Sequence, residues 1–336
     1  MGKWIRHKNI WCVLLILCFL TGCGNTDTQP TTERVQPDSE TEVVTEDPVP
    51  MSEVHEEAAS GNEEPPENFT PYEAPPFADA VFHETEAVDG VQLDLSSTAD
   101  GYVAIAATSE SRLKFQVLKD EVTYTYNIAS DGTPSIFPLQ CGDGHYTFRV
   151  MENVVDTKYA VKMTTEADVV LSDEFQPYLR PSDYVNYSQT SQCVSKASEL
   201  AAQAEDELGV VSEVFDYICS GVTYDKEKAA NVGTDYLPNP DETLATGKGI
   251  CFDYASLAAA MLRSQGIPTQ VIFGYVSPND LYHAWNMFYT EETGWVTVDY
   301  QVSQDTWNRL DLTFSANGAD ENFIGDGGNY ADVYIY

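Results

Sequence analysis

Basic residues are scarce in this chain. Its 336 residues include 17 lysines and arginines against 54 aspartates and glutamates, which gives a formal net charge of −37 at pH 7. Proteins that bind nucleic acid neutralise its phosphates with patches of lysine and arginine. The composition therefore excludes nucleic acid as a partner. The acidic excess favours a cationic partner or serves solubility alone.

Long apolar runs are also missing. The apolar run near the start, Ile10–Leu20, is too short to span a bilayer as a stable anchor. Lys3, Arg6 and Lys8 precede this run, and Leu-Thr-Gly-Cys23 ends it. The arrangement resembles the signal peptide of a bacterial lipoprotein, which is cleaved before a cysteine that receives lipid. This resemblance implies removal of residues 1–22 and lipidation of Cys23. It places the mature chain on the extracytoplasmic face of the cell membrane. The alternative is a simple secretory signal.

Residues 23–76 lack the apolar periodicity of a folded segment. Between residues 25 and 76 there are nine prolines and fourteen acidic residues against one basic residue, Arg34. Such a segment buries too little apolar surface to offset its ordering entropy, and its like charges extend it. We interpret residues 23–76 as a disordered tether between the lipid anchor and the folded part.

Residues 77–172 contain short runs in which apolar and polar residues alternate. Turn sequences rich in Asp and Gly separate the runs, a pattern typical of an antiparallel β-sandwich or barrel. The expected strands cover residues 91–95, 102–106, 113–117, 124–128, 145–150 and 159–163. No cluster of chemically active residues forms here. A spacer and a carbohydrate- or protein-binding module are equally compatible with the sequence.

Residues 173–336 mix helical and strand patterns. Ser191–Asp206 and Ser212–Ser220 repeat apolar residues at helical spacing. Ala255–Gln265 is rich in strong helix formers, and Gly266 and Pro268 mark its end. The last residues, 330–336, alternate like an edge strand whose aromatic face serves packing.

Residues 255–265 are expected to form a helix that begins a few residues earlier, and Cys251 lies in its first turn. Free backbone N–H groups and the positive end of the helix dipole favour a thiolate at this position. Gly247 and Gly249 precede the cysteine, and we expect them to leave space for a substrate. The alternative is an ordinary buried cysteine.

A hairpin is predicted from residues 284–289 and 295–302; His283 directly precedes its first strand, and Asp299 lies on its second. If Tyr289 pairs with Trp295, His283 and Asp299 share one face of the sheet and lie one diagonal step, about 7–8 Å, apart. A register error of one residue would place Asp299 on the opposite face. The alternative makes His283 a polar residue at a strand end and Asp299 a solvated one.

Three segments together resemble the catalytic core of the transglutaminase-like superfamily, whose fold is similar to that of papain-like cysteine proteases. The segments are Gly247–Val276, Tyr282–Tyr289 and Gly294–Gln301. The resemblance implies an α+β core with a nucleophile-bearing helix and an antiparallel sheet. It also implies that Cys251 is the nucleophile, His283 the base and Asp299 the residue that orients the base. The calcium sites of the animal enzymes have no visible counterpart, and we expect neither a metal nor another cofactor.

The implied reaction is acyl transfer on a protein or peptide substrate. His283 takes the Cys251 proton, and the thiolate attacks a glutamine side chain or a peptide amide. Water or an amine donor then resolves the thioester, so hydrolysis and cross-linking both remain open. The backbone N–H of Cys251 and the Tyr224 hydroxyl are the expected oxyanion donors. The alternative for Tyr224 is a core aromatic that closes the preceding helix.

Two classes of function follow from the sequence. The favoured class is a membrane-anchored cysteine protease, amidase or transglutaminase-type acyltransferase. The other class is a non-catalytic scaffold for binding or adhesion in the cell envelope. Cys193 and Cys219, on the two helices predicted before Cys251, either pair as a disulfide or remain free thiols.

Overall fold

The computed structural model of the protein describes residues 69–233, 235–276, 281–298 and 330–336. All of them belong to one compact unit, residues 63–336. The predicted signal peptide, Cys23 and most of the predicted tether lie outside the described residues, as does Asp299. Among the helices described, none has the length and apolar character needed to cross a membrane.

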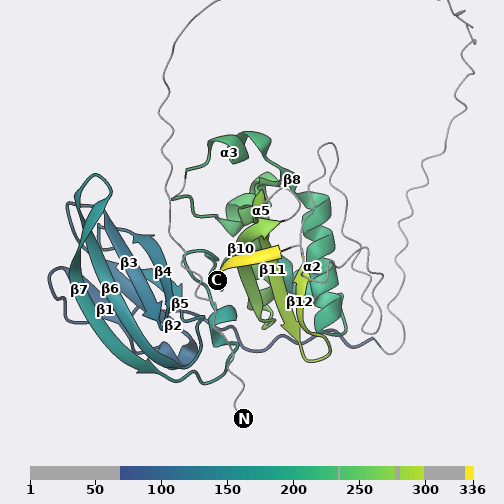
Figure 1. Ribbon diagram of the computed structural model, residues 1–336. Coiled ribbons are helices and arrows are strands. Elements are labelled where there is room, and N and C mark those ends of the chain that lie inside the picture. The colour runs from purple at the N-terminus through teal and green to yellow at the C-terminus, as the bar shows by residue number, and fades with distance from the viewer. Residues whose placement is uncertain (1–68, 234, 277–280, 299–329) are drawn as a thin grey trace, which may run out of the picture. The chain divides into compact units, whose positions relative to one another are not determined.

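The strand-rich region consists of two antiparallel sheets, drawn as blue and teal arrows in Figure 1. The three-stranded sheet, in the order β1-β2-β5, contains β1 (Val91–Asp94), β2 (Tyr102–Ala107) and β5 (Ser135–Pro138). The four-stranded sheet, in the order β4-β3-β6-β7, contains β3 (Leu113–Lys119), β4 (Val122–Ile128), β6 (Gly144–Val155) and β7 (Lys158–Val169). The antiparallel strands predicted from alternation are confirmed. The short strand β5 and the full length of the β6–β7 hairpin were not predicted.

Aromatic rings join the two sheets into a sandwich. The ring of Phe115 on β3 lies 5.4 Å from that of Phe137 on β5 and 6.1 Å from that of Phe148 on β6. All three side chains are buried. On β4 the buried Tyr124 and Tyr126 flank an exposed threonine, which is the alternation of a strand with one face in the core.

The helical region is built around one buried helix. Its helices are α1 (Gln192–Ala201), α2 (Glu207–Gly221), α3 (Lys226–Asn231), α4 (Pro240–Thr246) and α5 (Cys251–Ser264). The helix predicted after Cys251 is therefore confirmed. Every residue from Phe252 to Ser264 is buried, so α5 is enclosed on all sides rather than along one face. Helices α1, α2 and α4 and strands β10 and β11 all pack against it.

A third antiparallel sheet lies against α5, in green to yellow in Figure 1. Its strands, in the order β12-β11-β10-β13, are β10 (Thr269–Val276), β11 (Leu281–Thr290), β12 (Gly294–Val298) and β13 (Tyr330–Ile335). Tyr289 pairs with Trp295, as the hairpin prediction requires. The predicted edge strand at residues 330–336 is confirmed, since β13 lies at the edge of this sheet.

Arg263 joins three separate segments at the end of α5. The buried guanidinium donates hydrogen bonds to the carbonyl oxygens of Thr269 at 2.8 Å, Arg180 at 2.8 Å and Tyr336 at 3.0 Å. Burial lowers the pKa of Arg263 to about 10, so the side chain is a cation at neutral pH. These bonds hold the last residue of the sheet region against the central helix.

The end of the predicted tether lies against the helices. The backbone N–H of Tyr72 donates to the carbonyl of Ala204 at 2.7 Å, and its hydroxyl donates to the carbonyl of Gln265 at 2.9 Å. The ring of Phe77 meets that of Tyr187 edge-on at 5.7 Å. Ordered packing therefore includes residues that the composition alone assigned to the tether.

Candidate active site

Cys251 is the first residue of α5. Ile250, in the extended conformation, precedes it, and the chain enters the helix at the cysteine. Cys251 is partly exposed, whereas the residues that follow it in α5 are buried. The backbone N–H groups of the first helical turn have no partner within the helix, so they concentrate positive potential beside the sulfur.

The two glycines before Cys251 have structural roles. Gly247 ends α4 with a left-handed backbone at φ +60°, and its N–H donates to the carbonyl of Thr243 at 3.0 Å. A Cβ at Gly249 would lie 2.6 Å from the Cβ of Asp253, too close for any other residue. The prediction that these glycines leave space for a substrate is wrong, because the chain itself occupies that space.

Asp253 is a buried hydrogen-bond acceptor directly behind the nucleophile. Its side chain is fully buried and accepts hydrogen bonds from the Ile250 backbone N–H at 2.8 Å and from the Tyr236 hydroxyl. The Lys228 ammonium forms an ion pair with the same carboxylate at 2.8 Å. The turn that places Cys251 is therefore tied to α3 and to the loop before α4.

The ionisation of Lys228 and Tyr236 supports this network. Burial acts to lower the pKa of Lys228, but its hydrogen bonds to Asp253 and Tyr236 outweigh that effect and raise it. Burial and the hydrogen bond to Asp253 raise the pKa of Tyr236 to about 12. At neutral pH the lysine is a cation and the tyrosine a neutral hydrogen-bond donor. A buried carboxylate needs both kinds of partner to offset the cost of removing its charge from water.

Cys251 and His283 line one cavity of about 400 Å³. His283 lies near the start of β11, opposite Gly274 of β10. Strand β11 is fastened to the helix by the buried Asn286, whose Nδ2 donates to the carbonyls of Ala255 on α5 and Gln270 on β10, each at 3.0 Å. The structure thus brings the predicted nucleophile and base to the same cavity.

Most of the cavity wall is aromatic. The lining rings besides Tyr236 and His283 are Tyr184, Phe252, Phe273, Tyr282, Tyr334 and Tyr336. Among the described lining residues there is no lysine, arginine, aspartate or glutamate. Burial raises the pKa of Tyr184 to about 12 and also raises that of Tyr282, so these phenols are neutral. The sequence offered no signal for this wall beyond the alternating tyrosines at residues 330–336, which we interpreted as packing.

Tyr224 lies behind the nucleophile loop. It belongs to β8 (Thr223–Tyr224), which pairs in parallel with β9 (Lys248–Gly249) so that Tyr224 faces Gly249. Burial raises the pKa of Tyr224, and the proximity of Cys251 and Asp253 adds to the shift. Tyr224 is not among the described residues that line the cavity. Its role as an oxyanion donor stays a prediction.

Asp299 lies outside the described residues, and its role as orienter also stays a prediction. The condition on which that prediction depends is met, because the β11–β12 register runs from Thr290 opposite Gly294 to Asn286 opposite Val298. Val298 is the last described residue of β12.

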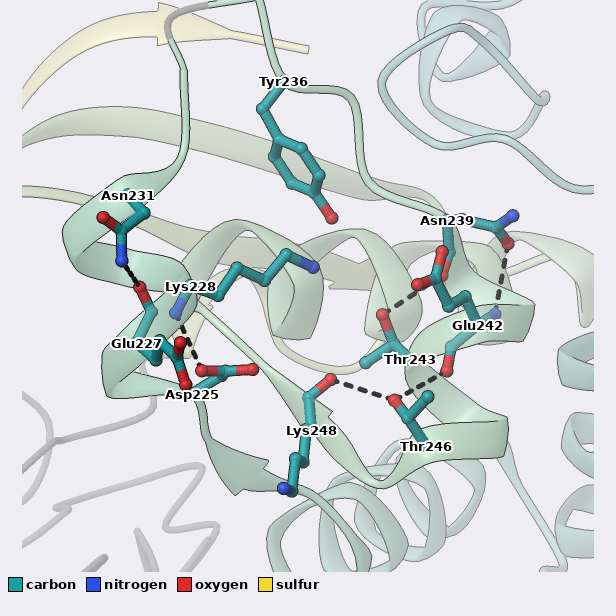
Figure 2. Close-up of a pocket in the computed structure, with 10 residues that line it drawn as sticks. All are labelled: Asp225, Glu227, Lys228, Asn231, Tyr236, Asn239, Glu242, Thr243, Thr246 and Lys248. Atoms are coloured by element: carbon teal, nitrogen blue, oxygen red, sulfur yellow. Dashed lines mark hydrogen bonds between the residues drawn. The ribbon is translucent and has the colours of Figure 1, made fainter.

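A second, polar pocket of about 630 Å³ shares Tyr236 and Lys228 with this region (Figure 2). Several of the polar groups drawn there serve the ends of short helices. Asn239 Oδ1 accepts the N–H of Glu242 at 3.2 Å, and Thr246 Oγ1 donates to the carbonyl of Glu242 at 2.8 Å. Within the part of the chain that the structure describes, no group of three or more His, Cys, Asp or Glu residues is placed to hold a metal ion.

The four described cysteines, Cys141, Cys193, Cys219 and Cys251, are free thiols. Cys193 is buried at the start of α1, where its backbone N–H donates to Asp241 Oδ1 at 2.8 Å. Burial and the Asp241 carboxylate raise the pKa of the Cys193 thiol. Burial also raises the pKa of the Cys141 thiol.

Comparison with known proteins agrees with the resemblance seen in the three motifs. The family model described as the transglutaminase-like superfamily matches residues 194–300. A protein-glutamine gamma-glutamyltransferase of Pseudomonas aeruginosa is 36% identical over 74 residues, which cover 18% of this chain and 11% of that protein. The matched stretch thus spans about a tenth of the length of that curated relative (11%).

Two solved structures match parts of the chain at low similarity. A candidate cysteine protease from Cytophaga hutchinsonii has a TM-score of 0.37 and 16% identity, over 69% of this chain and 73% of that one. Red sea bream transglutaminase has a TM-score of 0.29 and 14% identity, over 64% of this chain and 52% of that one. At these TM-scores we infer nothing further from either structure.

Proposed function

We propose that this chain, whose residues 194–300 form a transglutaminase-like core, is a cysteine enzyme that acts on protein or peptide amides through a thioester on Cys251. The observation that carries the proposal is the shared cavity of Cys251, at the start of α5, and His283, on β11. A thiol at a helix N-terminus beside a histidine base is the arrangement that activates a cysteine nucleophile.

The reaction begins with proton transfer from the Cys251 thiol to His283. The thiolate attacks the amide carbonyl carbon, and the Cys251 N–H and the Tyr224 hydroxyl stabilise the resulting oxyanion. The C–N bond then breaks, and ammonia or an amine leaves with the proton returned by His283. Water or a lysine amine attacks the thioester and frees Cys251. Asp299 holds the imidazole in the correct tautomer throughout.

The acyl donor is a glutamine side chain or a peptide amide. The name of the Pseudomonas aeruginosa relative supports the glutamine carboxamide. The aromatic wall is compatible with either donor, and the second substrate, water or amine, decides between hydrolysis and cross-linking.

We also propose that the enzyme is a lipoprotein anchored through Cys23 at the extracytoplasmic face of the cell membrane. The basic residues before Ile10–Leu20 and the cysteine that follows this run support that location. The acidic, proline-rich residues 25–68 would then hold the folded part away from the bilayer.

The experiment is an amide-transfer assay on the full-length protein. A capped glutamine peptide is supplied with and without a primary amine, and ammonia, the amine adduct and the mass of the enzyme are measured. We expect ammonia release and a peptide adduct on Cys251. Cys251→Ala should abolish both, whereas the matched control Cys219→Ala should retain them.

An amine-dependent product would assign cross-linking, and its absence with continued ammonia release would assign hydrolysis. If glutamine peptides and peptide-amide substrates alike give neither turnover nor an adduct on Cys251, the non-catalytic scaffold is the correct function.

A further inference from the structure

One wall of the Cys251 cavity comes from outside the transglutaminase-like core. Thr125 lines the cavity together with Cys251 and His283. This threonine is on β4, a strand of the β-sandwich that lies at one edge of its sheet. The sandwich therefore contributes directly to the space in front of the nucleophile.

Two tyrosines that flank Thr125 fix β4 in this position. The ring of Tyr124 lies 5.5 Å from that of Tyr336, and the ring of Tyr126 lies 5.9 Å from Tyr336 and 5.7 Å from Tyr184. Both Tyr124 and Tyr126 are buried, whereas Thr125 between them is exposed. The Thr125 Oγ1 accepts a hydrogen bond from the Gln116 side chain at 3.1 Å. Thr125 is thus an accessible side chain on a firmly held strand.

The cavity offers exposed rings, and its described wall includes no lysine, arginine, aspartate or glutamate. Tyr282 is 51% exposed and Tyr334 is 39% exposed, although both line it. The ring of Tyr184 stacks on that of Tyr336 at 4.3 Å. Aromatic faces and edges of this kind pair well with another ring. The lining therefore favours an uncharged aromatic group, even though the whole chain is strongly acidic and attracts cations at long range.

We propose that β4 is part of the substrate site and that Thr125 is a specificity-determining residue. The cavity selects peptides in which large uncharged side chains, best aromatic ones, flank the target amide. This inference rests on the proposed function and deepens it. It gives the sandwich a role in substrate selection.

The first test measures peptide binding without chemistry. Three capped glutamine peptides, with phenylalanine, alanine or lysine on both sides of the glutamine, are titrated against full-length Cys251→Ala protein by calorimetry. We expect the phenylalanine peptide to bind about tenfold more tightly than the alanine peptide. The lysine peptide should bind no more tightly than the alanine peptide. Tightest binding of the lysine peptide, or equal binding of all three, would overturn the proposal.

The second test uses two substitutions on the same strand. Thr125→Arg should weaken binding of the phenylalanine peptide about tenfold, because it places a long cation at a wall whose described residues include no lysine, arginine, aspartate or glutamate. Thr123→Arg is the matched control: Thr123 is also exposed on β4, but it is not among the described lining residues, so its effect should stay within about twofold. Equal effects of the two substitutions, or no effect of Thr125→Arg, would contradict a role for this position.

Thr125→Val keeps the shape of the side chain and should bind the phenylalanine peptide within about twofold of the starting protein. Equal alkylation of Cys251 by iodoacetamide, measured in Thr125 and Thr123 variants that retain Cys251, shows that the nucleophile is intact. Failure of the proposed function and failure of this inference would give different results. Selective binding without turnover would refute the proposed function alone, and equal turnover of the three peptides would refute the inference alone.

Discussion

Removal of the Asp253 carboxylate should destabilise the protein far more than its place in the sequence suggests. A carboxylate in the first turn of an exposed helix contributes roughly 0.3–1 kcal/mol through the helix dipole. In the structure Asp253 is 0% exposed and accepts hydrogen bonds from Ile250 and Tyr236. It also forms the ion pair with Lys228. The dipole term is therefore a minor part of its contribution.

The size of the expected stability loss follows from the Lys228 charge that Asp253→Ala leaves without its carboxylate partner. Removing one member of a buried ion pair costs about 3–5 kcal/mol, because the other charge stays uncompensated. The Lys228 side chain keeps 28% of its surface exposed, so water partly restores its solvation and the lower limit applies. We expect Asp253→Ala to lower the free energy of unfolding by about 3 kcal/mol. For a folded unit of this size, the midpoint of thermal unfolding should fall by roughly 6–12 °C.

A double-mutant cycle separates the ion pair from other effects of the substitution. Lys228→Met leaves Asp253 as the unpaired charge and should also destabilise the protein. The double variant Asp253→Ala/Lys228→Met carries no lone buried charge. Its loss of stability should be smaller than the sum of the single losses by at least about 1 kcal/mol.

The stability contributed by the Asp253–Lys228 ion pair depends on pH with a defined sign. Because the folded protein raises the pKa of Lys228, the ion pair stabilises the fold fully below the pKa of an unfolded lysine, about 10.4. That contribution is lost as the pH rises through the raised, folded-state pKa. The stability difference between the wild-type protein and Lys228→Met should therefore shrink above about pH 10.

The assay is urea unfolding of the full-length protein, followed by fluorescence of tryptophans that include the buried Trp285. A loss below about 1 kcal/mol for Asp253→Ala would show that the carboxylate acts through the helix dipole alone. Additive losses in the cycle would refute the coupling between Asp253 and Lys228.

Three further predictions concern the predicted orienter, the turn before the nucleophile and the membrane anchor. Asp299→Asn should lower turnover by about 10⁴-fold, because the amide favours the wrong tautomer of His283, while circular dichroism stays unchanged; full activity of this variant would exclude Asp299 as the orienter. Gly249→Ala should cost about 1–3 kcal/mol in urea unfolding, because the new Cβ would lie 2.6 Å from the Cβ of Asp253. Gly221→Ala is its control, since a Cβ there meets nothing within 4 Å, and an equal loss in both variants would contradict the steric reason. Cys23→Ser should release the protein from the membrane fraction or leave an uncut precursor on an immunoblot, and normal processing with full retention would contradict lipidation.

Local sequence patterns were sufficient to predict the helix and the hairpin that carry the candidate site residues. Strong helix formers followed by Gly266 and Pro268 predicted α5, which ends at Ser264. Aromatic and β-branched runs around Thr290–Gly294 predicted the hairpin and its Tyr289–Trp295 pair. These features depend on residues close together in the chain, so a short window of sequence contains the information.

Contacts between distant segments were not predictable in the same way. The role of Asp253 depends on Lys228 and Tyr236, which approach it only through tertiary packing. The place of Thr125 in the cavity depends on how β4 meets the C-terminal tyrosines. Gly249 illustrates the limit, because its sequence pattern fits a substrate path as well as close packing against Asp253.

The measurement that tests the central claim most directly is the alkylation rate of each cysteine in the native protein. Iodoacetamide is added to full-length protein near neutral pH, and Cys141, Cys193, Cys219 and Cys251 are followed by peptide mass spectrometry. The account predicts that Cys251 reacts first and that His283→Ala slows it, since the base and the helix N-terminus favour the thiolate. Equal rates for the four thiols, or a Cys251 that reacts last, would contradict a catalytic role for this residue.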